Sequence, residues 1–211
     1  MVTGDGLQRP RVLLIHGLLN GNLWLWRLAL RLRSAGFEPE VFTYSSLVEG
    51  PQRAVPKLVQ RLRQRPVEAL VGHSLGGLIG LQALREAPEL PVSRVVCLGS
   101  PLCGSQTARA LHASGVGRVP MGRSGEALTS SGLGAWQGRA QVGVVAGNRS
   151  LGAGRLFSHF EEGSDGTVGL DETRIPGLAD HVIVPASHSG LVFSAEAAAQ
   201  AAHFLREGRF R

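Results

Sequence analysis

Short apolar runs alternate along the chain with stretches in which apolar residues recur every three or four positions. The continuous runs lie in "RVLLIHG", "EVFTYS", "VEALVGHS", "SRVVCLGS", "AQVGVVAG" and "DHVIVPAS", and they predict six strands. The helical spacing appears from Leu25 to Leu32, from Val55 to Leu62, in "LGGLIGLQALREA" and in "SAEAAAQAAHFLREG". Strands that are apolar throughout and alternate with helices are typical of a mostly parallel sheet with helices on both faces. The sequence therefore predicts an α/β fold of about six strands.

The sequence also marks two helix ends and two long segments without a regular pattern. Gly36 is expected to stop the first helix, and Ser194 to cap the last one. Residues 104–140 and 147–163 follow neither pattern and are rich in glycine, serine and arginine. Because long loops in a compact domain are usually functional, residues 104–140 are a candidate lid or cap. Ligands of α/β sheets bind beyond the carboxyl ends of the strands, where such loops emerge.

Composition indicates one globular domain over residues 1–211, since 43% of the residues are hydrophobic and 18% are charged. The net charge of +6 comes from scattered arginines with few aromatic residues between them, which disfavours nucleic-acid binding. Nothing besides this charge supports contact with a membrane or lipid surface. No apolar stretch approaches the roughly 20 residues that span a bilayer, and no signal peptide is evident, so we expect a cytoplasmic protein. Cys97 and Cys103 lack metal-ligand spacing, and neither a metal nor a cofactor is expected.

The segment Gly72–Gly76, "GHSLG", places a serine between two glycines where a strand meets a helix. The pattern G-x-S-x-G alone is weak, because chance gives roughly 0.3 matches in a chain of this composition. Its position is specific, since a nucleophile elbow needs a strained turn between a strand and a helix. The glycines avoid a collision at the crossing, and Ser74 is left exposed at the helix N-terminus. The alternative is an ordinary N-cap serine beside packing glycines.

A nucleophilic serine needs a base, and His188 is the best placed of the seven histidines. It follows the last strand, so its loop emerges at the same sheet edge as Ser74. His181 begins that strand and belongs at the opposite edge. His73 adjoins the serine but is expected to point away.

The third member of such a site is a carboxylate that orients the imidazole. Asp165 lies in "SDGTVG", before the last strand, in a turn that can aim it inward. Asp171 has charged neighbours and is expected to be solvated, while Asp180 or a glutamate remains a third alternative. The order serine, aspartate, histidine is the one found in α/β-hydrolases.

Backbone donors for an oxyanion are expected at Leu75, directly after the serine, and at Leu18, in the glycine turn after the first strand. The alternative for "HG" in that turn is a plain strand ending. Trp24 and Trp26 follow this loop and either flank the entrance or anchor a helix. Apolar candidates for a substrate pocket are Leu19, Leu102, Met121, Trp136 and Leu191.

With these motifs assembled, the chain resembles the α/β-hydrolase superfamily, in particular small bacterial lipases and the inositol-deacylase-like lipase group. The resemblance runs from "LLIHGLLNG" through "VGHSLGG" and "CLGSPLCGS" to "SDGTVG" and "SHSGLV". It implies a minimal version of that fold, with Ser74 as nucleophile, His188 as base, Asp165 as acid, and Leu18 and Leu75 as oxyanion donors. The segment "GSPLCGS" departs from related lipases, which often carry a histidine after the proline.

The resulting hypothesis is a serine hydrolase that cleaves small-molecule acyl esters through an acyl-enzyme. Thioesterase or acyltransferase chemistry on the same fold is one alternative. A catalytically inactive hydrolase fold that serves as a binding module is the other.

Overall fold

The computed structural model describes residues 9–18, 21–113, 132–150 and 163–211, together with residues 124 and 128. Its centre is one sheet with the strand order β2-β1-β3-β4-β5-β6, in which every pair of neighbours is parallel. The strands are β1 (Arg11–Ile15), β2 (Glu38–Phe42), β3 (Ala69–His73), β4 (Arg94–Leu98), β5 (Gln141–Gly147) and β6 (Asp180–Val184). The prediction of a six-stranded parallel α/β sheet is thus confirmed.

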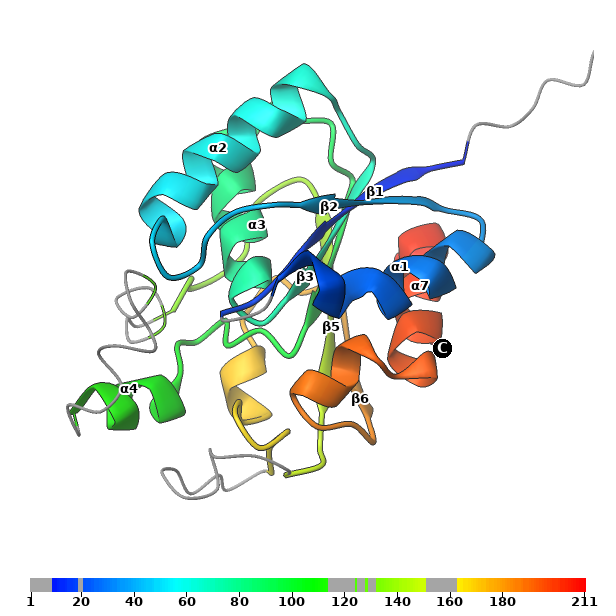
Figure 1. Ribbon diagram of the computed structural model, residues 1–211. Coiled ribbons are helices and arrows are strands. Elements are labelled where there is room, and N and C mark those ends of the chain that lie inside the picture. The colour runs from blue at the N-terminus through cyan, green and yellow to red at the C-terminus, as the bar shows by residue number, and fades with distance from the viewer. Residues whose placement is uncertain (1–8, 19–20, 114–123, 125–127, 129–131, 151–162) are drawn as a thin grey trace, which may run out of the picture.

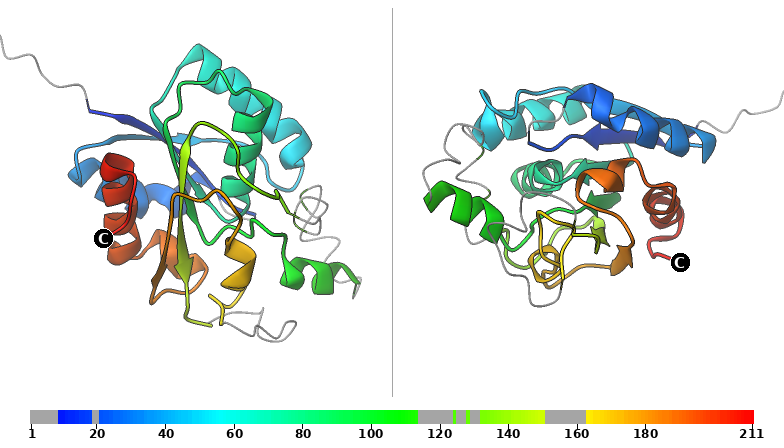
Figure 2. Two further views of the ribbon diagram at one scale, coloured as in Figure 1. Left: turned by 180° about the vertical axis from the view of Figure 1, so that it is seen from behind. Right: turned by 60° about the horizontal axis from the view of Figure 1, so that its bottom comes forward.

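Helices cover both faces of the sheet, as Figures 1 and 2 show. The α-helices are α1 (Trp26–Ser34), α2 (Gly50–Gln64), α3 (Leu75–Glu86), α4 (Gln106–Ala113) and α7 (Ala195–Glu207). The described residues also include the short 3-10 turns η1 (Asn22–Leu25), η4 (Asp171–Thr173) and η5 (Ser189–Val192). Ser194 caps α7 as expected, because its Oγ accepts the amide of Ala197 at 3.1 Å.

Alternate residues of the inner strands β1, β3, β4 and β5 enter two separate cores. In β1, Leu13 and Ile15 pack with α2 and α3 on one face. Val12 and Leu14 pack with α1 and α7 on the other face. Burial on both sides explains why these inner strands are almost continuously apolar instead of alternating with polar residues.

The second strand begins and ends earlier than the sequence predicts. It covers Glu38–Phe42, whereas the β-rich pattern placed it over "EVFTYS". After Phe42 the chain turns toward β1, where the Tyr44 hydroxyl donates to the carbonyl of His16 at 2.9 Å. The rings of Tyr44 and His16 stack with their centroids 4.3 Å apart. Tyr44 therefore contacts the loop after β1 and does not extend the pairing of β2 with β1.

The candidate lid falls largely outside the described residues. Of residues 104–140, the structure describes 104–113, which include the unpredicted helix α4, along with 124, 128 and 132–140. The lid therefore stays a prediction. None of the described helices is both long and apolar enough to span a membrane.

The turn between β3 and α3 leaves no space for side chains at the two motif glycines. A Cβ added to Gly72 would lie 2.4 Å from the amide nitrogen of Gly77, and one added to Gly76 would lie 2.2 Å from the carbonyl oxygen of Ile15. Both obstacles are backbone atoms that cannot rotate away. The helix therefore packs its first turn directly on the ends of β3 and β1.

This close approach predicts different effects for two glycines of α3. Gly76→Ala is expected to lower the free energy of unfolding by about 1–3 kcal/mol or more, because backbone has to shift. Gly80→Ala is the matched control, since its Cβ would meet the end of the Ile15 side chain at 3.3 Å. It should change stability by less than about 1 kcal/mol, since alanine also favours the helix. Urea unfolding checks both, and equal losses would contradict the proposed backbone contact.

Candidate active site

Ser74 stands in a strained backbone conformation between β3 and α3. Its φ of 54° is the only positive φ outside glycine in the described part of the chain. Such a conformation costs about 1–3 kcal/mol. Its amide donates to the carbonyl of Leu98 at 2.9 Å, and its carbonyl accepts from the amide of Gly77 at 3.1 Å. The Oγ makes no capping bond to α3, which argues against an ordinary N-cap serine.

The hydroxyl of Ser74 lies at the start of a chain of two hydrogen bonds. Its Oγ is 3.0 Å from Nε2 of His188, and Nδ1 of the same ring is 2.7 Å from Oδ2 of Asp165. The three residues come from the loops after β3, β5 and β6, which meet at the carboxyl edge of the sheet. Because the ionised carboxylate only accepts, Nδ1 carries the proton and Nε2 faces the hydroxyl as an acceptor.

A tight turn fixes the carboxylate of Asp165. Its second oxygen, Oδ1, accepts the amides of Thr167 at 2.9 Å and Val168 at 2.8 Å. Its carbonyl accepts the amide of His188 at 2.9 Å. Backbone and side chain of the aspartate thus both hold the histidine, and the side chain of Asp165 is only 2% exposed.

The alternative acids and the alternative histidine lie elsewhere. Asp171 is exposed in η4, as expected. Asp180 starts β6 and accepts the amides of His181 and Phe210 at 2.8 and 2.6 Å. His181 hydrogen bonds with Thr173 Oγ1 at 2.8 Å. Asp180 and His181 therefore lie at the amino end of their strand, opposite Ser74.

The glycine turn after β1 runs beside the serine. A Cβ on Gly17 would lie 3.0 Å from Cβ of Ser74, so the backbone that leads to Leu18 passes next to the hydroxyl. Leu75 is the first residue of α3. Within the described residues, no acceptor is recorded for the amides of Leu18 and Leu75. Both amides are thus candidates to donate to a ligand.

His73 contributes to the site, although the sequence led us to expect that it points away. Its Nε2 donates to the carbonyl of His188 at 3.0 Å, and the two ring centroids are 4.9 Å apart. Burial, and secondarily the nearby His188, lowers the pKa of the His73 imidazole to about 3. His73 is therefore neutral at physiological pH and holds the backbone of His188 without adding a charge.

Sequence reasoning also missed two residues that shape the surroundings. Gly99 has a φ of 56°, and a Cβ there would lie 3.0 Å from Oδ2 of Asp165 and 3.3 Å from Nδ1 of His188. Glu172, named in the sequence only as a charged neighbour of Asp171, is buried and accepts amides of Gln106 and Gly169. Burial raises the pKa of its carboxyl. A glycine after a buried strand was the one available signal for Gly99.

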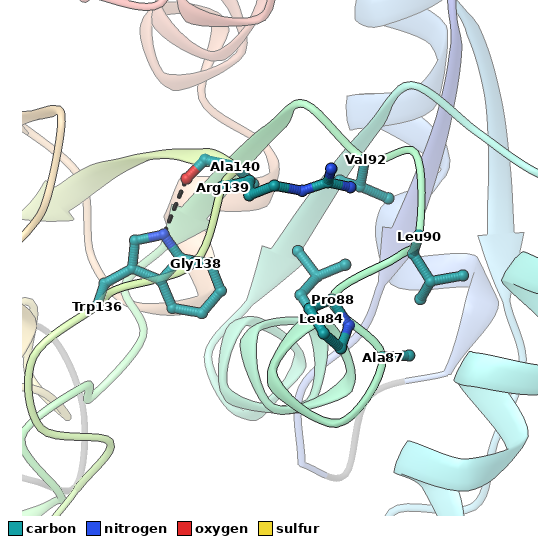
Figure 3. A pocket seen from close by; sticks show the side chains of 9 residues that line it. All are labelled: Leu84, Ala87, Pro88, Leu90, Val92, Trp136, Gly138, Arg139 and Ala140. Carbon is teal, nitrogen blue, oxygen red and sulfur yellow. Dashed lines mark hydrogen bonds between the residues drawn. The ribbon is translucent and has the colours of Figure 1, made fainter.

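Trp136 is not part of the site, which corrects its assignment to the substrate pocket. Its indole donates to the carbonyl of Ala140 at 2.8 Å, beside a cavity at the C-terminal end of α3 (Figure 3). This end lies by the amino ends of β4 and β5, whereas Ser74 precedes the first residue of α3. The cavity has a volume of about 20 Å³, which is room for about one water molecule and too small for an acyl chain.

The other pocket candidates have separate outcomes. Leu191 in η5 is fully buried. A Cβ on Gly99 would lie 2.7 Å from Cδ1 of Leu191 and 3.3 Å from Nδ1 of His188, so Leu191 lies close to His188. Leu102 is fully buried in the loop after β4. Leu19 and Met121 lie outside the described residues. A lining role for these four leucine and methionine residues remains a prediction.

Comparison with known proteins identifies the family. Residues 12–180 match the model of the alpha/beta hydrolase family, which is more than half of the chain. The chain therefore belongs to the alpha/beta hydrolase family.

Individual relatives agree with this assignment. RutD of Yersinia enterocolitica, which is named as a carbamate hydrolase, is 36% identical over 83 residues, covering 38% of this chain and 27% of its own length. The chain thus spans only about a quarter of this curated relative. The mature lipase BlEst2 of Bacillus licheniformis superposes with a TM-score of 0.75 at 19% identity, covering 95% of this chain and 92% of that one.

A second solved structure shares the fold over much of the chain. The phospholipase PlaB of Legionella pneumophila superposes with a TM-score of 0.69 at 18% identity, over 91% of this chain and 56% of its own. At such identities the likeness concerns the fold and leaves the substrate open.

The neutral state of buried His73 makes stability depend on pH. Its pKa is about 3 in the folded protein against 6.5 for a free imidazole. Between these values the unfolded chain binds a proton that the native protein does not. The stabilisation is therefore complete above pH 6.5 and is lost as the pH falls toward 3, by about 1 kcal/mol per pH unit.

Urea unfolding from neutral pH downward tests this in wild type and in His73→Gln. The variant replaces the buried ring with a smaller flexible side chain, whose amide can still donate to the His188 carbonyl, and is expected to be less stable at neutral pH. Its stability should then fall less steeply with acid, because glutamine does not titrate. The pKa of His181, lowered to about 4 mainly by burial, contributes equally to both proteins. Identical slopes would refute the buried neutral state.

Proposed function

We propose that this protein is a serine hydrolase that cleaves carboxylic acyl esters through an acyl-enzyme, with Ser74, His188 and Asp165 as its catalytic triad. The observation that carries the proposal is the unbroken hydrogen-bonded chain from Ser74 Oγ through His188 to Asp165. Membership of the alpha/beta hydrolase family supports it. No cofactor enters the proposed reaction.

In the first half of the reaction, Ser74 Oγ attacks the acyl carbon while its proton passes to Nε2 of His188. Asp165 stabilises the imidazolium that forms, because its carboxylate faces Nδ1–H at 2.7 Å. The negative charge on the tetrahedral oxygen is accepted by the amides of Leu18 and Leu75 and by the N-terminal end of α3. The carbon–oxygen bond then breaks, and His188 returns its proton to the departing alcohol.

In the second half, a water molecule replaces the alcohol. His188 removes a proton from this water as it attacks the acyl-enzyme, and the ester to Ser74 breaks. The serine regains its proton from His188, and the carboxylic acid leaves. The hydrogen bonds that hold His188 through its backbone keep the ring in place for both proton transfers.

Thioesters and acyl transfer use the same groups and remain the nearest alternatives. A thiolate leaves in place of the alcohol in the first case, and an alcohol or amine replaces water in the second. An inactive binding module is less consistent with the strained backbone of Ser74, because the strain has no purpose in a fold that only binds.

Substitution of the triad tests the mechanism. Ser74→Ala is expected to reduce hydrolysis of a nitrophenyl acetate or butyrate ester by about 10³-fold or more, and Asp165→Asn by about 10²–10⁴-fold. The matched control is Asp171→Asn, which alters an exposed carboxylate and should retain wild-type activity. A fluorophosphonate probe should label wild type at Ser74 and leave Ser74→Ala unlabelled. Equal activity of Ser74→Ala and wild type, both folded, would refute the proposal.

A substrate panel separates the acyl chemistries. Oxyesters, acyl-CoA thioesters and carbamate esters of matched acyl length are compared by kcat/KM. We expect the oxyesters to give the highest value, with all activities lost together in Ser74→Ala. A preference for acyl-CoA by tenfold or more would reassign the enzyme as a thioesterase while leaving the triad intact.

A further inference from the structure

Large apolar side chains gather outside the core where α1 and η5 meet. We call the set Leu23, Trp24, Trp26, Leu30 and Phe193 the aromatic patch. Leu23 is 82% exposed, Trp26 and Leu30 are 47% exposed, and Trp24 and Phe193 are 38% and 36% exposed. The rings of Trp24 and Phe193 lie 5.4 Å apart, so two distant segments form one surface. Figure 1 shows α1 and the segment of η5 side by side.

The outward side of α1 contributes Trp26 and Leu30 to the patch, while Leu23 and Trp24 belong to η1 and Phe193 follows η5. Leu28 and Leu32 of this helix are buried against the sheet, and they account for its attachment to the core. Trp26 and Leu30 are four residues apart and therefore share the opposite face. This helix is thus apolar on two sides, and only one of them is used by the fold.

The surroundings of the patch are basic. Residues 6–37 contain five arginines and no aspartate or glutamate. Arg27 and Arg33 are exposed on α1, and the guanidinium of Arg27 lies 5.1 Å from the ring centroid of Trp26. Arg31 donates to the carbonyl of Phe193 at 3.3 Å and joins α1 to the end of η5. Glu196, which is exposed in the first turn of α7, is the acidic residue nearest to Phe193 in the sequence.

We propose that the aromatic patch docks the protein on an anionic phospholipid surface. Exposed tryptophan, phenylalanine and leucine flanked by arginine are the composition of helices that lie in the membrane interface. Arginines near the surface attract acidic headgroups, and indole rings settle at headgroup depth. A second copy of this chain is a poorer occupant, because the net charge of +6 and a patch edge rich in arginine repel an identical face.

The patch also adjoins the candidate active site along the chain. The turn η1 begins four residues after Leu18, and Phe193 follows His188 by five residues. In the sequence, the proposed oxyanion donor and the base therefore each lie about five residues from a member of the patch. Docking does not depend on the proposed catalysis, but if both hold, a bilayer on the patch delivers lipid acyl groups beside Ser74.

Co-sedimentation with vesicles tests the docking. Vesicles of phosphatidylcholine alone are compared with vesicles of phosphatidylcholine mixed with phosphatidylglycerol. The wild-type protein is expected to bind the anionic vesicles about tenfold more tightly, with a blue shift of its tryptophan emission and a loss of binding as salt is added. Equal binding to both kinds of vesicle, or binding to neither, would overturn the proposal.

Two variants locate the surface, and a third serves as the control. Trp26→Ser/Leu30→Ser should weaken binding about tenfold or more, and Arg27→Gln/Arg33→Gln should remove the preference for anionic vesicles. Leu47→Ser/Val48→Ser changes exposed apolar residues elsewhere and should bind like wild type. All three should hydrolyse a soluble short ester at the wild-type rate, which shows that they fold. Wild-type binding by Trp26→Ser/Leu30→Ser would exclude the patch.

Two further measurements distinguish lipid docking from the proposed hydrolysis and from self-association. Ser74→Ala is expected to bind vesicles as wild type does, so failure of the proposed hydrolysis and failure of docking are distinguishable. Sedimentation velocity without lipid is expected to show a monomer. A dimer that is lost in Trp26→Ser/Leu30→Ser would assign the patch to self-association and overturn the lipid proposal.

Discussion

The first turn of α3 rests on the backbone of β1 and β3, and the position of Ser74 depends on this contact. With no side chain at Gly72 or Gly76, the helix starts immediately where the strand ends, and the residue between them has to adopt a positive φ. The strain is offset by the Ser74 amide, which donates to Leu98 and extends the ladder between β3 and β4 by one bond. A residue held this way projects from the sheet edge and has little freedom to withdraw.

The other two members of the site are held by backbone as much as by side chains. His188 receives hydrogen bonds at its carbonyl from His73 and gives one from its amide to Asp165. The aspartate in turn is fixed by the amides of its own turn. Such preorganisation matters because the charges that appear during acyl transfer then meet dipoles that need no reorientation. Glu172 connects this turn to the start of α4, so the loops of this edge form one connected unit.

Local patterns predicted much of this structure, and contacts between distant segments account for what they missed. Apolar runs located all six strands, most clearly the four inner strands, which are buried on both faces, and the cap at Ser194 follows from its own neighbours. The end of β2 could not be predicted, because Tyr44 leaves the strand to contact His16, 28 residues away. Trp136 was misplaced because hydrophobicity indicates burial without indicating which end of the sheet is involved. For Ser74, Asp165 and His188, the order along the chain selected side chains that lie in contact, while their catalytic roles stay predictions.

The buried and exposed faces of α1 can be altered separately. Substitutions on the exposed face therefore test lipid docking without disturbing the core. Burial of Leu28 and Leu32 attaches the helix to the core. Each Å² of apolar surface removed from water stabilises the fold by roughly 25 cal/mol. Trp26 and Leu30 are about half exposed and obtain only part of this stabilisation. The cation–π contact from Arg27 shields one ring but leaves the others in water. Folding gains little from these side chains, so we infer that their clustering reflects contact with a partner outside the chain, and an acidic lipid surface matches both the apolar side chains and the surrounding arginines.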